Sequence, residues 1–258
     1  MMCRTPRPSW KSAALLALLA AAGCGRSMHV EILASTPAIA PGAAWDVEQA
    51  ALDKAVAQAL RPGWRVVVAP ISDRSLTEEP LASLELPNLS AWGLTEGQFT
   101  KNVLPPAEQQ ARKAMLALRT RGTSKKRTEI IAAIDAASDR FAEDAQRERL
   151  LVVLSTSYEQ SSFLNTGDYR LNLGDAEQQR IINHLKAVGA FPHLAGVRVC
   201  MAGITSGKDN WADPIRARNL KQFWKRFFSE AGAALVLYDV SLDGCGPLFL
   251  NVSIANRT

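Results

Sequence analysis

The stretch WRVVVAPI at residues 64–71 is an almost unbroken run of apolar residues, many of them β-branched. Similar runs recur as LLVVL at 150–154, VRVCMA at 197–202 and AALVLY at 233–238. A continuous apolar run of this length is typical of a strand that is buried on both faces of a parallel sheet. These four segments therefore predict a mostly parallel sheet with a covering layer on each side.

The segments between these runs have the periodicity of amphipathic helices, with apolar residues three and four positions apart. We expect helices at 45–60, 106–119, 129–147, 175–188 and 214–231, and surface loops at 78–104 and 155–174. Strands that alternate with helices predict an α/β fold, Rossmann-like and three-layered, with helices on both faces. Residues 248–254 (LFLNVSI) can add an edge strand, and residues 45–258 are expected to form a single domain.

The N-terminus has the features of an export signal. Residues 1–23 contain three basic and no acidic residues, and 13–22 (AALLALLAAA) are entirely apolar. That run is far shorter than the ~20 residues of a membrane-spanning helix. It has the length of a signal-peptide core. We therefore expect residues 1–23 to be removed and residues 24–44 to form a tether, in which 29–33 can form one short strand.

Ala21-Ala22-Gly23-Cys24 resembles the lipobox of bacterial lipoproteins. The resemblance implies that Cys24 is acylated and anchors the chain to a membrane, because each buried CH₂ of an acyl chain contributes about 0.8 kcal/mol. In Gram-negative lipoproteins an Asp after the acylated cysteine favours retention in the inner membrane. Residue 25 is Gly, so the resemblance implies the outer membrane, facing the periplasm, over the inner membrane. The alternative is an ordinary secretory signal that is cleaved near Ala22 or Gly25.

The net charge of the mature chain does not favour a nucleic-acid-binding function. Removal of residues 1–23 lowers the net charge from +5 to +2, which gives no indication of nucleic-acid binding.

Cys200 and Cys245 remain in an oxidising compartment, where a disulfide between them is possible. Cys200 lies in the middle of a predicted strand, however, and such a cysteine is more often a small buried hydrophobic residue.

Polar residues follow the predicted strands at the edge where parallel sheets usually carry their sites. Ser72-Asp73-Arg74-Ser75-Leu76-Thr77 follows the run at 64–71, Thr128 precedes a predicted helix that it is placed to cap, and Thr156 follows the run at 150–154. This order resembles the von Willebrand factor type A family, in which a D-x-S-x-S loop, a helix-capping threonine and a strand-end aspartate form a metal-ion-dependent adhesion site.

The resemblance covers residues 62–240 and implies that Mg²⁺ binds at a degenerate form of that site. Asp73, Ser75 and Thr77 match D-x-S-x-[ST], Thr128 matches the threonine, and Thr156 stands where the aspartate is expected. Hydroxyl and carboxylate oxygens are the ligands that Mg²⁺ prefers, but Thr156 removes one of the two carboxylates. The alternative is that Asp73, Ser75 and Thr77 only form Asx and ST turns.

These features favour a cell-envelope lipoprotein whose domain binds a macromolecular partner, an envelope protein, without catalysis. No catalytic residue stands out, and Trp92 and Trp211, both in predicted loops, are candidate anchors for the partner because Trp is enriched in binding hot spots. Two other interpretations remain open. One is a metal-assisted hydrolase that uses Asp73, and the other is a structural component of an envelope secretion or conjugation assembly.

Overall fold

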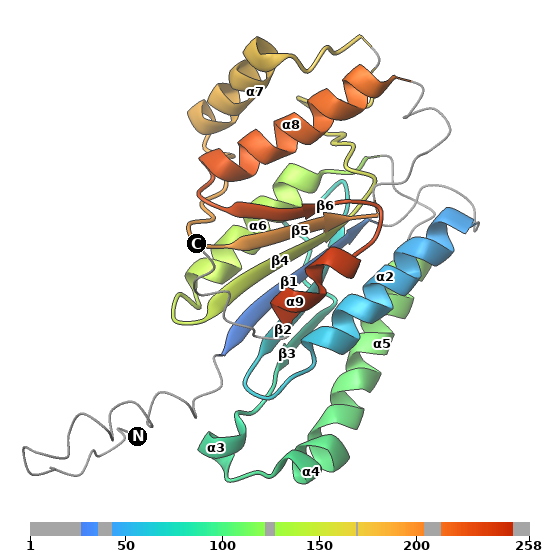
Figure 1. Ribbon diagram of the computed structural model, residues 1–258, viewed down its shortest axis with the longest axis vertical. Coiled ribbons are helices and arrows are strands. Elements are labelled where there is room, and N and C mark those ends of the chain that lie inside the picture. The colour runs from blue at the N-terminus through green and yellow to red at the C-terminus, as the bar shows by residue number, and fades with distance from the viewer. Residues whose placement is uncertain (1–26, 36–42, 122–126, 169, 204–212, 250–258) are drawn as a thin grey trace, which may run out of the picture.

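The computed structural model describes residues 27–35, 43–121, 127–168, 170–203 and 213–249. Within them, six strands form one sheet in the order β3-β2-β1-β4-β5-β6 (Figure 1). All neighbouring pairs are parallel except β2 and β3, which are antiparallel. The strands are β1 (Met28–Ser35), β2 (Arg65–Ile71), β3 (Ala82–Glu85), β4 (Glu148–Leu154), β5 (Arg198–Ala202) and β6 (Ala234–Tyr238).

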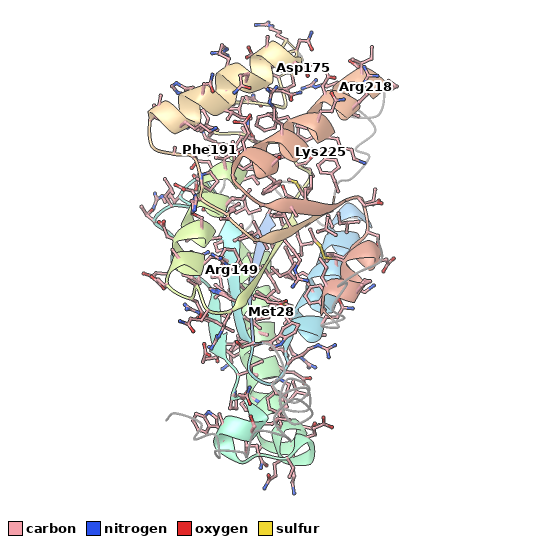
Figure 2. The ribbon with its side chains drawn as sticks, turned by 60° about the vertical axis from the view of Figure 1, so that its left-hand side comes forward. Met28, Arg149, Asp175, Phe191, Arg218 and Lys225 are labelled. Atoms are coloured by element: carbon pink, nitrogen blue, oxygen red, sulfur yellow. A yellow bond between two sulfur atoms is a disulfide. The ribbon has the colours of Figure 1, made fainter. Side chains whose placement is uncertain are left out.

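Helices cover both faces of the sheet, as Figures 1 and 2 show from two directions. One face packs against α2 (Ala43–Ala59), α5 (Leu104–Arg121) and α9 (Gly246–Phe249). The other packs against α6 (Ile130–Ala142), α7 (Asp175–Ala187) and α8 (Pro214–Glu230). The predicted α/β, Rossmann-like, three-layer fold with a mostly parallel sheet is therefore confirmed. None of the described helices combines the length and hydropathy that a membrane span needs.

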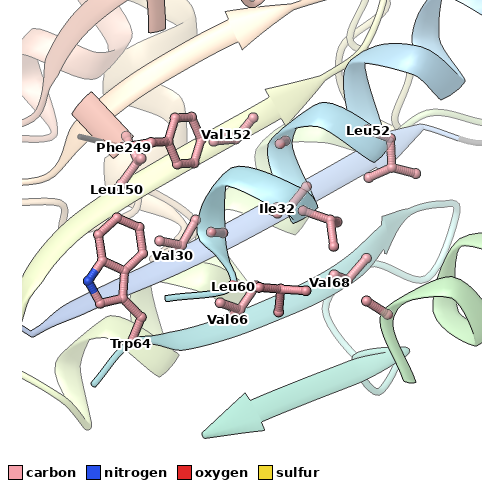
Figure 3. Close-up of a cluster of buried hydrophobic side chains, with 14 of the residues drawn as sticks. Val30, Ile32, Leu52, Leu60, Trp64, Val66, Val68, Leu150, Val152 and Phe249 are labelled. Carbon is pink, nitrogen blue, oxygen red and sulfur yellow. The ribbon is translucent and has the colours of Figure 1, made fainter. Parts of the chain in front are cut away.

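The two faces of the sheet belong to separate hydrophobic cores, because successive side chains of a strand point to opposite sides. Val30 and Ile32 of β1 lie beside Val66 and Val68 of β2 and pack beneath Leu52 of α2 (Figure 3). On the other face, the aromatic side chains of α8 pack against one another and against the sheet. This burial on both faces explains the continuous apolar runs of β2, β4 and β5. The fourth predicted strand, β6, is also present, but it lies at the edge of the sheet and is only partly buried.

The central strand of the sheet was not expected to be part of the domain. The sequence placed residues 24–44 in a tether, but β1 pairs with β2 on one side and β4 on the other, and every one of its residues from Met28 to Ala34 is buried. The predicted domain start at residue 45 is therefore wrong. The pattern was misleading because β1 (MHVEILAS) carries two ionisable residues, His29 and Glu31, which interrupt its apolar run.

Those two side chains are buried within a polar network on the α6 side of the sheet. Arg140 of α6 donates two hydrogen bonds from Nε, 3.0 and 3.1 Å, and one from Nη2, 2.8 Å, to the carboxylate of Glu31. His29 Nε2 lies 2.9 Å from Glu31 Oε1, and the His29 ring packs edge-on against Phe141. Because a buried carboxylate is strongly destabilising without partners, Arg140 is what permits Glu31 in the central strand.

The segment at 78–104 is more ordered than the predicted loop. It contains the edge strand β3, the short helices α3 (Leu89–Trp92) and α4 (Glu96–Gln98), and a π-helical turn, η1 (Phe99–Val103), that continues into α5. Local capping accounts for this order, since Asn88 caps α3 and Thr95 forms a capping box with Gln98.

The C-terminal part of the described chain also differs from the expectation. Where an edge strand was predicted at 248–254, residues 246–249 form α9, and the remaining residues lie outside the described part. Cys200 of β5 and Cys245 of the 3₁₀ helix η2 (Asp243–Cys245) form a disulfide with a Cα–Cα separation of 6.2 Å. Cys200 is therefore bonded as well as buried, and the disulfide fastens η2 and α9 onto the sheet.

Candidate functional site

The candidate site lies at the carboxyl edge of the sheet, where the loops after the parallel strands meet. Two of these loops are described in full or nearly so: residues 72–81 after β2, here called the β2 loop, and residues 155–174 after β4, here called the β4 loop. Main-chain hydrogen bonds join both to the segment before α6, since Glu129 N donates to Ser72 O, 3.2 Å, and Gln160 N donates to Thr128 O, 2.9 Å. The structure thus brings together the three segments that the sequence singled out.

Inside the β2 loop, the predicted metal ligands form a turn. Ser75 Oγ donates to Ser72 O, 2.9 Å, and accepts from Ser72 N, 2.8 Å, while Thr77 Oγ1 donates to Arg74 O, 3.4 Å. Asp73 is exposed at the tip of this turn. These contacts support the turn chemistry that the sequence analysis left open for Asp73, Ser75 and Thr77, because the hydroxyl groups are used within the loop.

Thr128 does not cap α6, contrary to the prediction. The residue at the N-cap is Glu129, and its side chain makes no capping hydrogen bond. The carboxylate of Glu159, from the β4 loop, takes that role, because Ile131 N donates to Glu159 Oε2, 2.9 Å. Sequence reasoning missed Glu159, since a capping residue 28 positions after the amide that it accepts from, Ile131 N, leaves no local pattern.

The residues predicted to hold magnesium supply one carboxylate, that of Asp73. Residues 64–71 are the first continuous apolar run after the tether, but β1 precedes them, so that Asp73 follows the second strand of the sheet. Thr156 is half-buried, two positions after the end of β4, and brings no carboxylate. In the described part of the chain, no three His, Cys, Asp or Glu side chains gather in a group that could hold a metal ion.

Among the described acidic residues of this edge, Glu159 has the most strongly shifted pKa. It is fully buried, and burial raises its pKa to about 7, against the opposing effect of the Ile131 amide. Glu129 lies nearby, and its pKa is also raised, first by burial and then by the charge of Asp73, although Arg127 lowers it. Among the described residues, Glu159 Oε1 and the buried Ser155 Oγ have no hydrogen-bond partner.

The β4 loop is fixed to α8 and β6 through Ser157. Ser157 has a φ of 67°, which among the described non-glycine residues is the one positive value. Its carbonyl oxygen accepts a hydrogen bond from Trp224 Nε1, 2.9 Å, and its Oγ lies 2.8 Å from the Tyr238 hydroxyl. Burial raises the pKa of Tyr238 to about 12, so this phenol stays protonated at neutral pH. The strained backbone is thus stabilised by two aromatic residues from other elements.

Large apolar side chains are exposed on the loops of this edge. Leu76 in the β2 loop is 58% exposed and Phe163 in the β4 loop is 46% exposed. Ile215, at the start of α8 after β5, and Val240, just after β6, are also exposed. A pocket adjoins Phe163 between the β4 loop and α7, and Asp168, Arg180 and His184 contribute to its lining. Sequence reasoning did not find these residues, because an apolar side chain in a loop gives no sign of whether it is buried.

The tryptophans proposed as partner anchors do not both belong to this edge. Trp92 is exposed on α3, which follows β3 and begins beside the amino end of β2. It therefore lies at the opposite edge of the sheet from Asp73. Trp211 lies outside the described residues, as does Cys24, the predicted lipidation residue.

Comparison with known proteins yields a likeness in structure alone. No protein-family model matches the chain. A search of curated proteins also finds no match. Among solved structures, the chain is similar to the conserved hypothetical protein BatB from Bacteroides thetaiotaomicron, with 12% sequence identity and a TM-score of 0.41 over 88% of this chain and 96% of that chain. At this identity and TM-score, the likeness carries no argument about function.

Proposed function

We propose that this chain is a cell-envelope lipoprotein, anchored through Cys24 to the outer membrane, whose von Willebrand factor type A-like domain binds an envelope protein. The interface would be the carboxyl edge of the sheet. The observation that carries this proposal is the set of large apolar side chains exposed on the segments that follow β2, β4, β5 and β6 at that edge: Leu76, Phe163, Ile215 and Val240.

Exposed apolar side chains contribute most to the free energy of binding when they are already ordered in the free protein. Burial of apolar surface contributes about 25 cal/mol per Å². Association loses part of this gain if side chains and loops must first be immobilised. The β4 loop that carries Phe163 is already fixed through Ser157 and Glu159, by bonds to Trp224 and Ile131. A preorganised loop with an exposed aromatic residue has the character of a binding hot spot.

The proposal is tested by comparing variants of the two edge residues with a matched control elsewhere. Phe163→Ser and Ile215→Ser remove apolar surface from the carboxyl edge, whereas Leu116→Ser removes an equally exposed side chain from α5. Cells expressing each full-length variant are treated with a chemical cross-linker, and the cross-linked products are identified by mass spectrometry. We expect one envelope protein to be recovered with the wild type and with Leu116→Ser, and at least about tenfold less, equivalent to 1.4 kcal/mol, with the edge variants. Equal recovery from all variants would contradict the proposal.

The lipid anchor is tested separately. Replacement of Cys24 by Ser removes the acylated thiol, so the protein should leave the membrane fraction and lose incorporation of a labelled fatty acid. Retention of both properties in Cys24→Ser would show that another feature attaches the chain to the membrane, whereas absence of both properties from the wild type would favour the ordinary secretory signal.

A further inference from the structure

We propose that residues 88–103, here called the Trp92 projection, lie against the lipid surface of the membrane to which the chain is anchored. The inference rests on the lipid anchor at Cys24 proposed above, and it goes beyond that function by assigning a second, non-covalent membrane contact. It also orients the domain, with the carboxyl edge directed away from the bilayer.

The exposure of Trp92 is the first observation. Its side chain is 73% exposed, the largest value among the exposed large apolar residues of the described chain. A tryptophan ring is amphipathic, and such rings are enriched at the headgroup level of membranes. Leu89 and Leu94, on either side, are only partly buried, so the tip is apolar beyond a single ring.

The projection is a well-formed structure and presents Trp92 on a fixed turn. Asn88 Oδ1 accepts from Ser90 N, 3.0 Å, at the start of α3, and Gly93 ends the helix with a φ of 63°. Trp92 N donates to Asn88 O, 3.2 Å. At the other end, Phe99 is buried in the core beneath α5 and fixes the projection to the domain.

The projection lies at the same edge of the sheet at which the chain enters from its proposed anchor. Leu86 N donates to Trp64 O, 2.9 Å, and Gly63 N donates to Pro87 O, 3.1 Å, so α3 begins directly beside the amino end of β2. β2 pairs in parallel with β1, whose first residue is Met28. Figure 2 shows labelled Met28 on the side of the sheet toward α3 and α4, with α7 and α8 at the far end.

The length of the connecting chain limits how far this edge can be from the bilayer. Cys24 precedes Met28 by four residues in the sequence. Four residues span at most about 14 Å even when fully extended. An acylated Cys24 would therefore keep the amino end of β1 close to the headgroups, and a projection at this edge would lie within reach of the interface.

The charge of the projection is compatible with a lipid surface. Among its sixteen residues, Glu96 and Lys101 are the charged ones, so its net charge is zero, whereas 21% of the whole chain is charged. Few charges must be desolvated when the tip approaches the headgroups, which lowers the cost of contact. A lipid surface is therefore the occupant that the tether length, the exposed ring and the low charge together favour.

The test uses the lipidated full-length protein in vesicles of phosphatidylethanolamine and phosphatidylglycerol. Ala91→Cys introduces an exposed thiol next to Trp92, while Cys200 and Cys245 are in a disulfide and Cys24 is acylated. A polarity-sensitive dye on this thiol should shift its emission to shorter wavelength and be quenched by headgroup-linked nitroxide lipids. The matched control is the same dye on Ile215→Cys, at the carboxyl edge, which should remain unquenched.

A second variant shows whether Trp92 itself makes the contact. In Ala91→Cys/Trp92→Lys, the quenching should decrease severalfold, because a lysine does not replace the amphipathic ring. Equal quenching at positions 91 and 215 in protein that floats with the vesicles would overturn the inference and leave a protein partner as the occupant of the tip. Protein that fails to float would overturn the anchor and this inference together, while the cross-linking result at the carboxyl edge would be unaffected.

Discussion

The carboxylate of Glu159 and the backbone N–H of Ile131 form a hydrogen bond of 2.9 Å across 28 residues of sequence. Through it, a buried acid of the β4 loop caps the first turn of α6, where unpaired amides and the helix dipole favour negative charge. Burial outweighs this effect and raises the pKa of Glu159 to about 7. The same contact therefore joins the candidate binding edge to the fold and makes it sensitive to pH.

Glu159→Gln should remove a pH dependence from stability. In the native state the acid stays protonated up to about pH 7, whereas its ordinary pKa is 4.5. The contribution of the protonated Glu159 side chain to the free energy of unfolding is thus fully present below pH 4.5. This contribution, on the order of 3 kcal/mol, is lost as the pH rises through 7. As the pH rises from 4.5 to 7, the Tm of the wild type should decrease relative to the Tm of Glu159→Gln. Parallel Tm curves would show that Glu159 is already ionised in the fold.

Glu159 also shows why the candidate site could be predicted only in outline. The sequence placed polar residues after β2 and β4 and before α6, and the structure brings these segments together, because strand ends are visible in apolar runs. It could not show which side chain caps α6 or that Ser75 hydrogen-bonds to Ser72, since these choices depend on contacts between loops. Nor could it distinguish the exposed Phe163 from a core residue.

Arg140→Ala should be strongly destabilising. It would leave the fully buried Glu31 without the three hydrogen bonds that Arg140 donates. Removal of one partner of a buried pair typically costs about 3–5 kcal/mol. Arg180→Ala provides the control, because its pair with Glu177 is exposed to solvent and should contribute little to stability. Denaturant unfolding of the two variants measures the difference, and equal losses would contradict a structural role for the buried pair.

The same pair explains the error in the predicted domain boundary. The strands at 64–71, 150–154, 197–202 and 233–238 were predictable because each is a continuous apolar run between helices. β1 was recognised only as a possible short strand in a tether, since His29 and Glu31 resemble surface residues. The partner of Glu31, Arg140, lies 109 residues after it. A central strand with a buried carboxylate cannot be identified without the residue that neutralises it.

Cys200→Ala/Cys245→Ala should lower stability without unfolding the sheet. The disulfide closes a loop with a sequence separation of 45. In the chain-entropy treatment, such a loop contributes about 4 kcal/mol. The Tm of the wild type in reductant should approach that of the double variant, and the double variant should not respond to reductant. A wild type that melts at the same temperature with and without reductant, while its free thiols are shown to increase, would contradict this contribution.

Two substitutions of Ser157 should separate backbone strain from side-chain bonding. Ser157→Ala keeps a Cβ at a φ of 67° and loses the contact with the Tyr238 hydroxyl, at a cost of about 1 kcal/mol. Ser157→Gly loses the same contact but relieves the left-handed conformation, which costs a non-glycine residue roughly 1–2 kcal/mol. The glycine variant should therefore equal or exceed the alanine variant in Tm. Because Ser157 also fixes the loop that carries Phe163, both variants should cross-link less partner than the wild type. A Tm for Ser157→Gly well below that of Ser157→Ala would show that the left-handed conformation costs less than the conformational freedom that glycine adds to the unfolded chain.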